Sequence, residues 1–150
     1  MIEELQDYLA KEFDIHFSDP RLLAEAFTQA SYVNEHPHQN LKFYERIEFL
    51  GDAVLELIVS EYIYKCYPEL PQGKLTRLRA AMVCEDSFSK FAKECHFDQY
   101  IRLGHGEELA GARQRPGLLC DIFESFVGAL YLDQGRPAVE KFVRRVIFPK

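Results

Sequence analysis

The stretch ERIEFLGDAVLELI, residues 45–58, decides how this 150-residue sequence is interpreted. Its apolar residues recur every three or four positions, which is the spacing of an α-helix with one buried face. The side that we expect to meet the core holds Ile47, Leu50, Val54, Leu57 and Ile58. The stretch therefore predicts the centre of an amphipathic helix over about residues 41–66.

The other side of this predicted helix is acidic. At about 100° per residue, Glu45, Glu48 and Asp52 lie within an arc of about 60°. Uncompensated like charges at this spacing destabilise a helix by roughly 0.2–0.5 kcal/mol per pair. Two interpretations follow: a solvated acidic face, or a bound divalent cation, because hard cations such as Mg²⁺ prefer carboxylate oxygens. Phe49 borders the carboxylates, either as an ordinary exposed phenylalanine or as a side chain that fills a pocket in another helix or subunit.

A second helix, predicted over about residues 118–133, has the same design. Asp121 and Glu124 share one face, with Gly128 one turn further on, and the remaining positions are mostly apolar. A helix that is apolar on most sides is expected to be buried. Buried carboxylates are costly unless they are paired, protonated or bound to a metal. Because Gly128 would let the 41–66 helix approach closely, we expect Glu48 and Asp52 to lie against Asp121 and Glu124.

An alternative for these carboxylates is a structural salt bridge. No Lys or Arg lies three or four residues from Asp121 or Glu124 within the helix. A distant arginine, for instance Arg46, Arg77 or Arg79, could still neutralise them. Helical geometry alone does not choose between the cation site and the salt bridge.

The rest of the chain is also predicted to be helical. Period-2 alternation of apolar and polar residues is not sustained anywhere, whereas the helical period is common. The length suits a single domain with one core. We therefore predict one all-α domain with breaks around residues 36–40, 68–73 and 104–117. The helices are expected at about residues 2–13, 20–33, 41–66, 74–83, 85–95, 118–133 and 137–147.

Composition narrows the function classes. No apolar run approaches the roughly 18 residues of a membrane span, and the acidic N-terminus does not resemble a signal peptide. The four cysteines form no CxxC pair, which predicts reduced thiols and a cytoplasmic location. The net charge is −6: residues 1–73 carry 14 acidic against 5 basic side chains, a net of −9, and residues 74–150 carry 10 against 13, a net of +3. An acidic half that holds cations and a basic half that faces a polyanion are compatible with this division.

The whole chain resembles the ribonuclease III family. The stretch ERIEFLGDAVL, residues 45–55, closely resembles the family's signature motif. Further similar segments follow the family's order: AFTQASY at residues 26–32, GKLTRLR at 73–79, YIRLGHGE at 100–107 and LCDIFESFVGALYLDQG at 119–135.

This resemblance implies an all-helical endonuclease domain that forms a homodimer. It implies hydrolysis of double-stranded RNA with Mg²⁺ as cofactor and Mn²⁺ as a substitute, leaving 5′-phosphate and 3′-hydroxyl ends in the processing of rRNA and mRNA precursors. By position, Glu48, Asp52, Asp121 and Glu124 would hold the metal, with Asp52 and Glu124 as catalytic residues. Glu45 would lie near the RNA, and Phe49 would insert into a socket on the partner subunit.

The chain departs from the family pattern at a few positions. Gln72 stands where most members have a glutamate, and it could hydrogen-bond RNA or a water on the metal but supplies no charge. Gln29 stands where a histidine is usual, and Cys120 replaces a small alanine. Full-length members continue into a double-stranded RNA-binding domain, whereas this chain ends at Phe148-Pro149-Lys150. We therefore expect residues 1–150 to be the catalytic domain of a longer protein, with a natural short form as the alternative.

Candidate RNA contacts and rival functions complete the expectations. Lys74, Arg77, Arg113 and Arg115 are candidate phosphate contacts beside Gln72, with a solvated surface as the alternative. The chief rival function is a catalytically weak or silent module that binds RNA or the ribosome. An all-α phosphohydrolase acting on small molecules would need His and Asp ligand pairs, which the sequence lacks.

Overall fold

The computed structural model describes residues 2–148. The chain's last two residues, where the sequence suggested a continuation into a further domain, lie outside the described residues. Within residues 2–148 the fold is all-helical, as predicted, and the one β-type pairing is an isolated bridge between Thr28 and Arg102. The helices are α1 Ile2–Phe13, α2 Pro20–Ala26, α3 Ala30–Glu35, α4 Glu45–Cys66, α5 Gln72–Met82, α6 Glu85–Glu94, α7 His105–Leu109, α8 Pro116–Gln134 and α9 Arg136–Val146, with short 3₁₀ turns η1 Pro37–Gln39, η2 Phe97–Tyr100 and η3 Ala112–Gln114.

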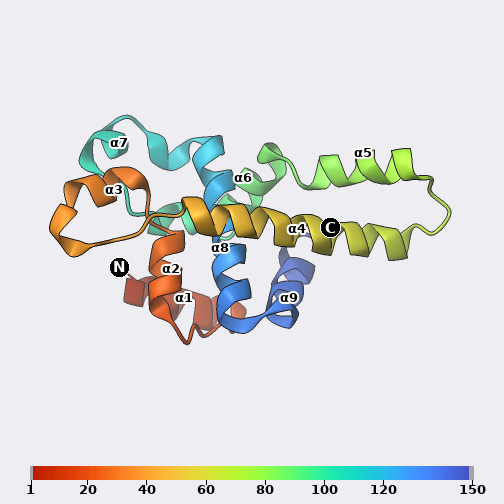
Figure 1. The fold of residues 1–150 in the computed structure, drawn as a ribbon, viewed down its shortest axis with the longest axis horizontal. Helices are drawn as coiled ribbons and strands as arrows, with labels where there is room; N and C mark the ends of the chain where they lie inside the picture. Colours follow the sequence, from red (N-terminus) through yellow and green to blue (C-terminus); the bar gives the residue numbers. More distant parts are fainter. Residues whose placement is uncertain (1, 149–150) are drawn as a thin grey trace.

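Helix α8 is the centre of the domain. Eleven of the thirteen residues from Leu118 to Leu130 are buried, as expected from the apolar sequence of this helix. Figure 1 shows α8 running through the middle of the molecule behind α4, with α2 and α9 on its flanks. The aromatic core that surrounds it joins Phe27, Phe97, Phe126 and Phe142.

Helix α4 crosses α8 at a contact between two glycines. A Cβ atom on Gly51 would lie 1.7 Å from the carbonyl oxygen of Glu124, and a Cβ on Gly128 would lie 2.4 Å from the carbonyl oxygen of Ile47. Real side-chain atoms do not approach so closely, so only glycine fits at either position. The sequence-based expectation for Gly128 is therefore confirmed, and the second glycine, Gly51, belongs to the same contact.

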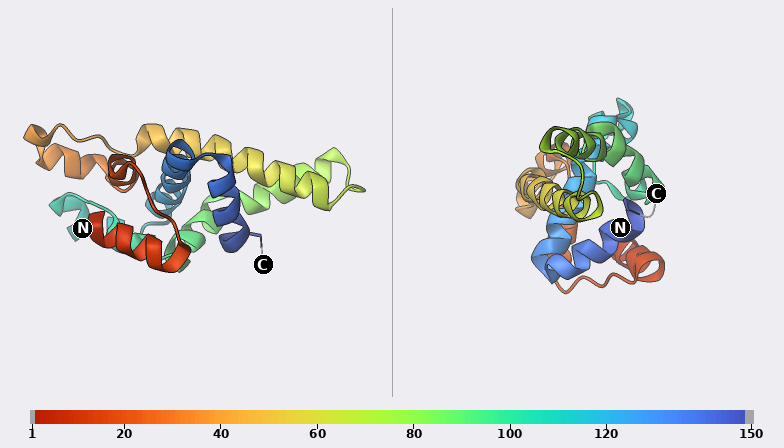
Figure 2. Two further views of the ribbon diagram at one scale, coloured as in Figure 1. Left: turned by 90° about the horizontal axis from the view of Figure 1, so that it is seen from below. Right: turned by 90° about the vertical axis from the view of Figure 1, so that its right-hand side faces the viewer.

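The C-terminal half of α4 and the whole of α5 form an arm that projects from the domain (Figures 1 and 2). No residue of α5 is buried. Tyr64 on α4 is 71% exposed. The interpretation of Leu57 as a core residue was wrong, because Leu57 lies in the half of α4 that forms the arm and is 55% exposed.

The boundaries differ from the sequence-based prediction in three places. Helix α4 begins at Glu45 rather than near residue 41. The helix predicted over 20–33 is two helices, because the chain turns at Thr28 to pair with the segment around Arg102. The backbone N–H of Arg102 donates to Phe27 O at 2.7 Å, and the N–H of Gln29 donates to Arg102 O at 3.0 Å. The break predicted over 104–117 contains the short helix α7. No helix of the described residues has the length and apolar character needed to span a bilayer.

Candidate metal centre

The four acidic residues singled out in the sequence lie together at the α4–α8 crossing. The carboxyl group of Glu48 lies beside that of Asp121, and the carboxyl group of Asp52 lies beside that of Glu124, because each neighbour contributes to the raised pKa of its glutamate. Each pair joins one residue of α4 to one residue of α8. The closely packed glycines place the two backbones near enough for the short acidic side chains to meet.

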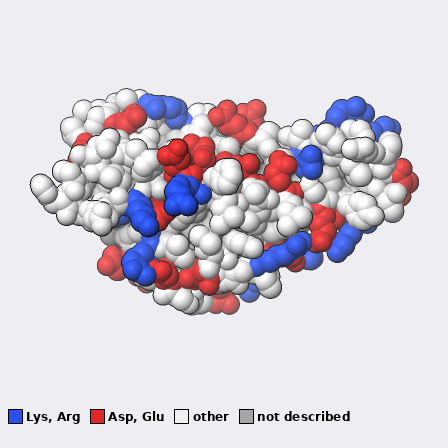
Figure 3. Space-filling model, viewed as in Figure 1, with Lys and Arg blue, Asp and Glu red and all other residues white. Residues whose placement is uncertain are grey.

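The four carboxylates, two from each helix, are named the acidic row. The two carboxylates on α8, those of Asp121 and Glu124, have oxygens within 4.8 Å of each other and of the Cys120 Sγ atom. On α4, Glu48 is a neighbour of both Asp121 and Asp52, and Asp52 is a neighbour of Glu124. Figure 3 shows acidic side chains gathered near the middle of the molecule, over the region where α4 crosses α8, and basic side chains over the α5 end.

Burial and mutual repulsion perturb these carboxyl groups. Glu124 is 9% exposed, and its burial, followed by the neighbouring Asp52, raises its pKa to about 9. Burial also raises the pKa of Glu48, with Asp121 and then Asp52 adding to the effect. Both carboxyl groups therefore hold protons that an isolated glutamate would lose, which is the response expected of crowded carboxylates without a neighbouring cation.

No basic side chain of the described residues compensates the charge of the four acids. Within residues 2–148, none of the four acids forms an ion pair with a lysine or arginine. Of the arginines considered from the sequence, Arg79 bonds to Glu56 at 3.6 Å and to Ser60 Oγ at 3.0 Å. Arg46 lies near Glu25. The structure therefore does not support the salt-bridge alternative.

The donor set fits a hard divalent cation. Its oxygens are carboxylates from two helices, the ligand type that Mg²⁺ and Mn²⁺ prefer. A bound dication would supply the positive charge that the basic side chains of the described residues do not provide. It would thereby lower the pKa values of Glu48 and Glu124. These carboxylates are thus the residues that would hold a metal.

Tyr44 is a site residue that the sequence analysis missed. It precedes α4, and its hydroxyl donates to Asp121 Oδ2 at 2.9 Å. Its backbone N–H donates to Thr28 O at 3.0 Å, which fixes the start of α4. No local pattern connects positions 77 residues apart, so only the fold reveals this contact.

Phe49 and Glu45 border a groove beside the cluster. Phe49 is 80% exposed, in agreement with its predicted position on the acidic face. The groove has a volume of about 730 Å³ and is lined by Leu22, Glu25, Glu45, Arg46, Ile47, Phe49, Leu50 and Leu132. Several of these side chains are apolar, so the groove could accept another apolar side chain.

The structure does not bring Gln72 to the acidic cluster of its own chain. Gln72 begins α5 at the far end of the arm. The sixteen residues of α4 from Gly51 to Cys66 alone span about 22 Å at a rise of 1.5 Å per residue. Lys74 and Arg77 lie on the same exposed helix, and neither forms an ion pair within the described chain. A role for this surface at a metal would require a second molecule.

Arg113 and Arg115 are engaged in contacts within the chain. The guanidinium of Arg113 bonds to Glu108 and donates to Asp98 O at 2.8 Å. Arg115 is 3.5 Å from Glu107 Oε2. These partners make Arg113, in particular, a structural residue of the segment between α7 and α8.

The comparisons with known proteins agree with this geometry. The Ribonuclease-III-like family matches residues 19–150. Ribonuclease 3 of Limosilactobacillus reuteri is 91% identical over the whole chain, which covers 64% of that protein, and Ribonuclease 3 of Limosilactobacillus fermentum is 83% identical, with 65% covered. The nuclease domain of ribonuclease III from Campylobacter jejuni has a TM-score of 0.87 at 34% identity, with 96% of this chain and 99% of that one covered. The chain spans about two-thirds of the length of the relatives that it matches, and it belongs to the ribonuclease-III-like family.

Proposed function

We propose that this chain is the catalytic domain of a double-stranded RNA endonuclease of the ribonuclease III type. The observation that carries the proposal is the row of four carboxylates from α4 and α8, two of them with raised pKa values and none with a basic partner among the described residues. The Ribonuclease 3 name of its 91% identical relative supports it. In this proposal residues 1–150 form the nuclease domain, and an RNA-binding domain lies in the part of the protein that this chain does not include.

Glu48, Asp52, Asp121 and Glu124 would hold Mg²⁺, with Mn²⁺ as a substitute. The chemistry that such an ion supplies is a lower pKa for the attacking water and stabilisation of negative charge on the attacking and leaving oxygens. Asp52 and Glu124 would orient that water and fix the phosphodiester relative to it, and Tyr44 would hold the carboxylate of Asp121. Attack by water rather than the ribose 2′-hydroxyl would leave 5′-phosphate and 3′-hydroxyl ends. Precursors of rRNA and mRNA are the proposed substrates, and a cytoplasmic location remains a prediction from the sequence.

A homodimer is part of the proposal. The exposed Phe49 and the adjacent groove of about 730 Å³ offer a protruding apolar side chain and a receiving surface on one molecule. A two-fold axis would let each Phe49 enter the groove of the other subunit, because an isologous interface uses the same patch twice. The name of the Campylobacter jejuni structure refers to a region involved in dimer formation, which supports a dimer but does not identify its interface. Two clusters in one dimer could then cut the two strands of a duplex.

The RNA would contact the exposed basic face of α5. Lys74 and Arg77 are free to bind phosphates, Gln72 is available as a hydrogen-bonding group, and Glu45 lies where the groove meets the acidic row. Arg113 and Arg115 would first have to exchange their partners Glu108 and Glu107 for phosphates. We therefore expect Lys74 and Arg77 to contribute more to RNA affinity than Arg113.

Cleavage of long duplex RNA tests the proposed function. The purified chain is incubated with duplex RNA in Mg²⁺, in Mn²⁺ and in EDTA, and the products are separated on a gel and their 5′ ends analysed. We expect cleavage in either metal and none in EDTA. Asp52→Asn and Glu124→Gln should each lower the rate by at least about 100-fold, with the fold retained by circular dichroism.

Glu56→Gln is the matched control, because Glu56 lies one turn beyond Asp52 on α4 but bonds to Arg79. Its rate should stay within about threefold of the wild type, since exposed ion pairs contribute little. Binding of duplex RNA without cleavage in either metal would reject the nuclease and favour the RNA- or ribosome-binding module, for which Gln72 in place of a glutamate is the supporting feature.

A further inference from the structure

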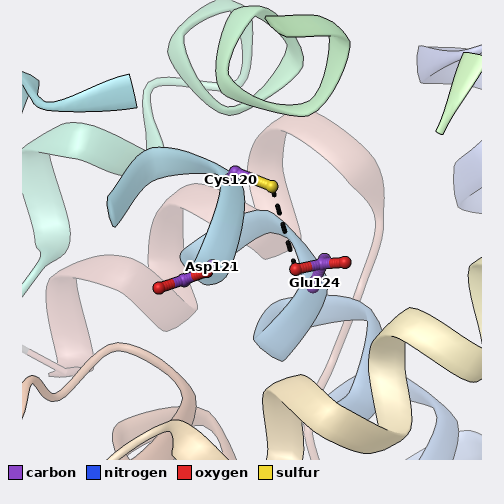
Figure 4. A group of neighbouring side chains, drawn as sticks. All are labelled: Cys120, Asp121 and Glu124. Atoms are coloured by element: carbon purple, nitrogen blue, oxygen red, sulfur yellow. Dashed lines mark hydrogen bonds between the residues drawn. The ribbon is translucent and has the colours of Figure 1, made fainter. Parts of the chain in front are cut away.

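A sulfur atom borders the acidic row. Cys120 lies one turn before Glu124 on α8, and its Sγ atom is 3.8 Å from Glu124 Oε1 (Figure 4). One donor atom from each of Cys120, Asp121 and Glu124 can be chosen such that all three lie within 4.8 Å of one another. Among the described residues, no other group of three His, Cys, Asp or Glu side chains brings its donor atoms so close.

These spacings suit a small tetrahedral ion. Zn²⁺ binds cysteine sulfur at about 2.3 Å and carboxylate oxygen at about 2.0–2.2 Å. Tetrahedral angles then place a bound sulfur and a bound oxygen about 3.6 Å apart, close to the 3.8 Å observed between Cys120 and Glu124. The oxygen of Asp121 lies within 4.8 Å of both other donors, so each of these two separations needs to shorten by no more than about 1.4 Å to reach a tetrahedral spacing.

The chemistry of the donor set separates two classes of metal. Mg²⁺ is hard, takes oxygen ligands and keeps several waters, so the thiol adds nothing to its binding. Zn²⁺, Cd²⁺ and Co²⁺ accept thiolate, and one sulfur with two carboxylates gives them three protein ligands and leaves a position for water. Cys120 thus lies where it can discriminate between ions that compete for the same carboxylates.

We propose that Cys120, Asp121 and Glu124 form a site for thiophilic divalent cations, such as Zn²⁺ and Cd²⁺, which exclude Mg²⁺ from the acidic row and thereby inhibit the domain. The inhibition rests on the proposed function, because the same two carboxylates are assigned to Mg²⁺ there. Binding forms a sulfur–metal bond and releases the thiol proton to solvent, so that Cys–SH and M²⁺ give Cys–S–M⁺ and H⁺. No oxidant or reductant is involved.

Metal titrations of the purified chain, stripped of metal and kept reduced, test this site. Co²⁺ and Cd²⁺ are the probes, because a bound thiolate gives each a charge-transfer absorption band in the ultraviolet. We expect the band in the wild type and in Cys66→Ala, the control for an exposed cysteine at the end of α4. Cys120→Ala and the nearly isosteric Cys120→Ser should lose it, and Zn²⁺ added to the wild-type Co²⁺ complex should remove it.

Two further readings separate this site from the proposed function. The Zn²⁺ concentration that halves Mg²⁺-supported cleavage, measured against each variant's own zinc-free rate, should rise about tenfold or more in Cys120→Ala, since even indirect partners of a metal change affinity by 10–100-fold. A missing band in the wild type, or a band retained in Cys120→Ala and Cys120→Ser, would overturn the thiophilic site while Mg²⁺-dependent cleavage remained. A Cys120-dependent band without any cleavage would retain the binding site and reject the nuclease.

Discussion

The α4–α8 crossing and the α4–α5 arm share one helix but differ in what covers it. At the crossing, Gly51 and Gly128 leave no room for even one added carbon atom. In the arm, α5 has no buried residue, and a Cβ on Gly73 would meet nothing within 4 Å. The crossing fixes the positions of side chains to fractions of an ångström, as a metal site requires. The arm instead presents exposed side chains whose partners lie outside the chain.

The largest expected effect compares the two regions directly by adding a methyl group to each. Gly51→Ala should lower the free energy of unfolding by at least about 3 kcal/mol, because its Cβ meets backbone rather than a movable side chain. Gly73→Ala should raise it by about 0.5 kcal/mol, because alanine is the better helix former and the site is open. Urea unfolding of both variants measures this, and equal changes would contradict the proposed difference in packing.

The next largest expected effect is the weakening of the proposed dimer when Phe49 is truncated. Phe49→Ala should raise the dissociation constant of the proposed dimer about 30-fold, the equivalent of about 2 kcal/mol for an aromatic side chain inserted in a pocket. Leu109→Ala is the matched control, because Leu109 is similarly exposed at 75% but lies on α7 away from the groove. Sedimentation at decreasing protein concentrations measures both. A dimer that Phe49→Ala leaves unchanged would move the interface away from the groove.

These predictions depend on features that the sequence revealed to different degrees. The acidic row was predictable because Glu48, Asp52, Asp121 and Glu124 each follow the helical period, and a glycine on α8 indicated a close approach. The break at Thr28 was not predictable from the sequence. Backbone hydrogen bonds to Arg102, 74 residues away in the chain, override the local preference for a helix there. The exposure of Leu57 was not predictable either, because periodicity identifies the apolar face of a helix but not how much of its length another helix covers.

The raised pKa of Glu124 predicts a smaller, pH-dependent effect at the crossing. An unfolded glutamate ionises near pH 4.5, whereas burial beside Asp52 raises the pKa of Glu124 to about 9. Between these values the native state holds more protons than the unfolded state, so its stability falls as the pH rises. In EDTA, the free energy of unfolding of the wild type relative to Glu124→Gln should therefore fall by at least about 1 kcal/mol from pH 6 to pH 8, where one fully linked proton would give about 2.7 kcal/mol.

Mg²⁺ should reverse this trend. Saturating Mg²⁺ at pH 8 should raise the melting temperature of the wild type and of Glu56→Gln, because the ion binds the native carboxylates only. Glu124→Gln should gain little. A flat pH response together with equal Mg²⁺ stabilisation of all three proteins would show that the carboxylates do not act as one electrostatic unit.

The smallest effect concerns how the crossing orients one ligand. Tyr44→Phe removes the hydroxyl that donates to Asp121 Oδ2, so Asp121 loses its fixed orientation but not its charge. We expect the affinity for Mg²⁺, measured by calorimetry, to fall about threefold, because Asp121 is only half-buried and water can replace the hydroxyl. Tyr8→Phe is the matched control, since its hydroxyl donates to Cys95 O at 2.6 Å far from the acidic row. Tyr8→Phe should lose stability and keep its Mg²⁺ affinity. If Tyr44 only stabilised the fold, Tyr44→Phe would give the same result. A lower Mg²⁺ affinity in Tyr44→Phe but not in Tyr8→Phe would therefore place Tyr44 among the residues that position the metal ligands.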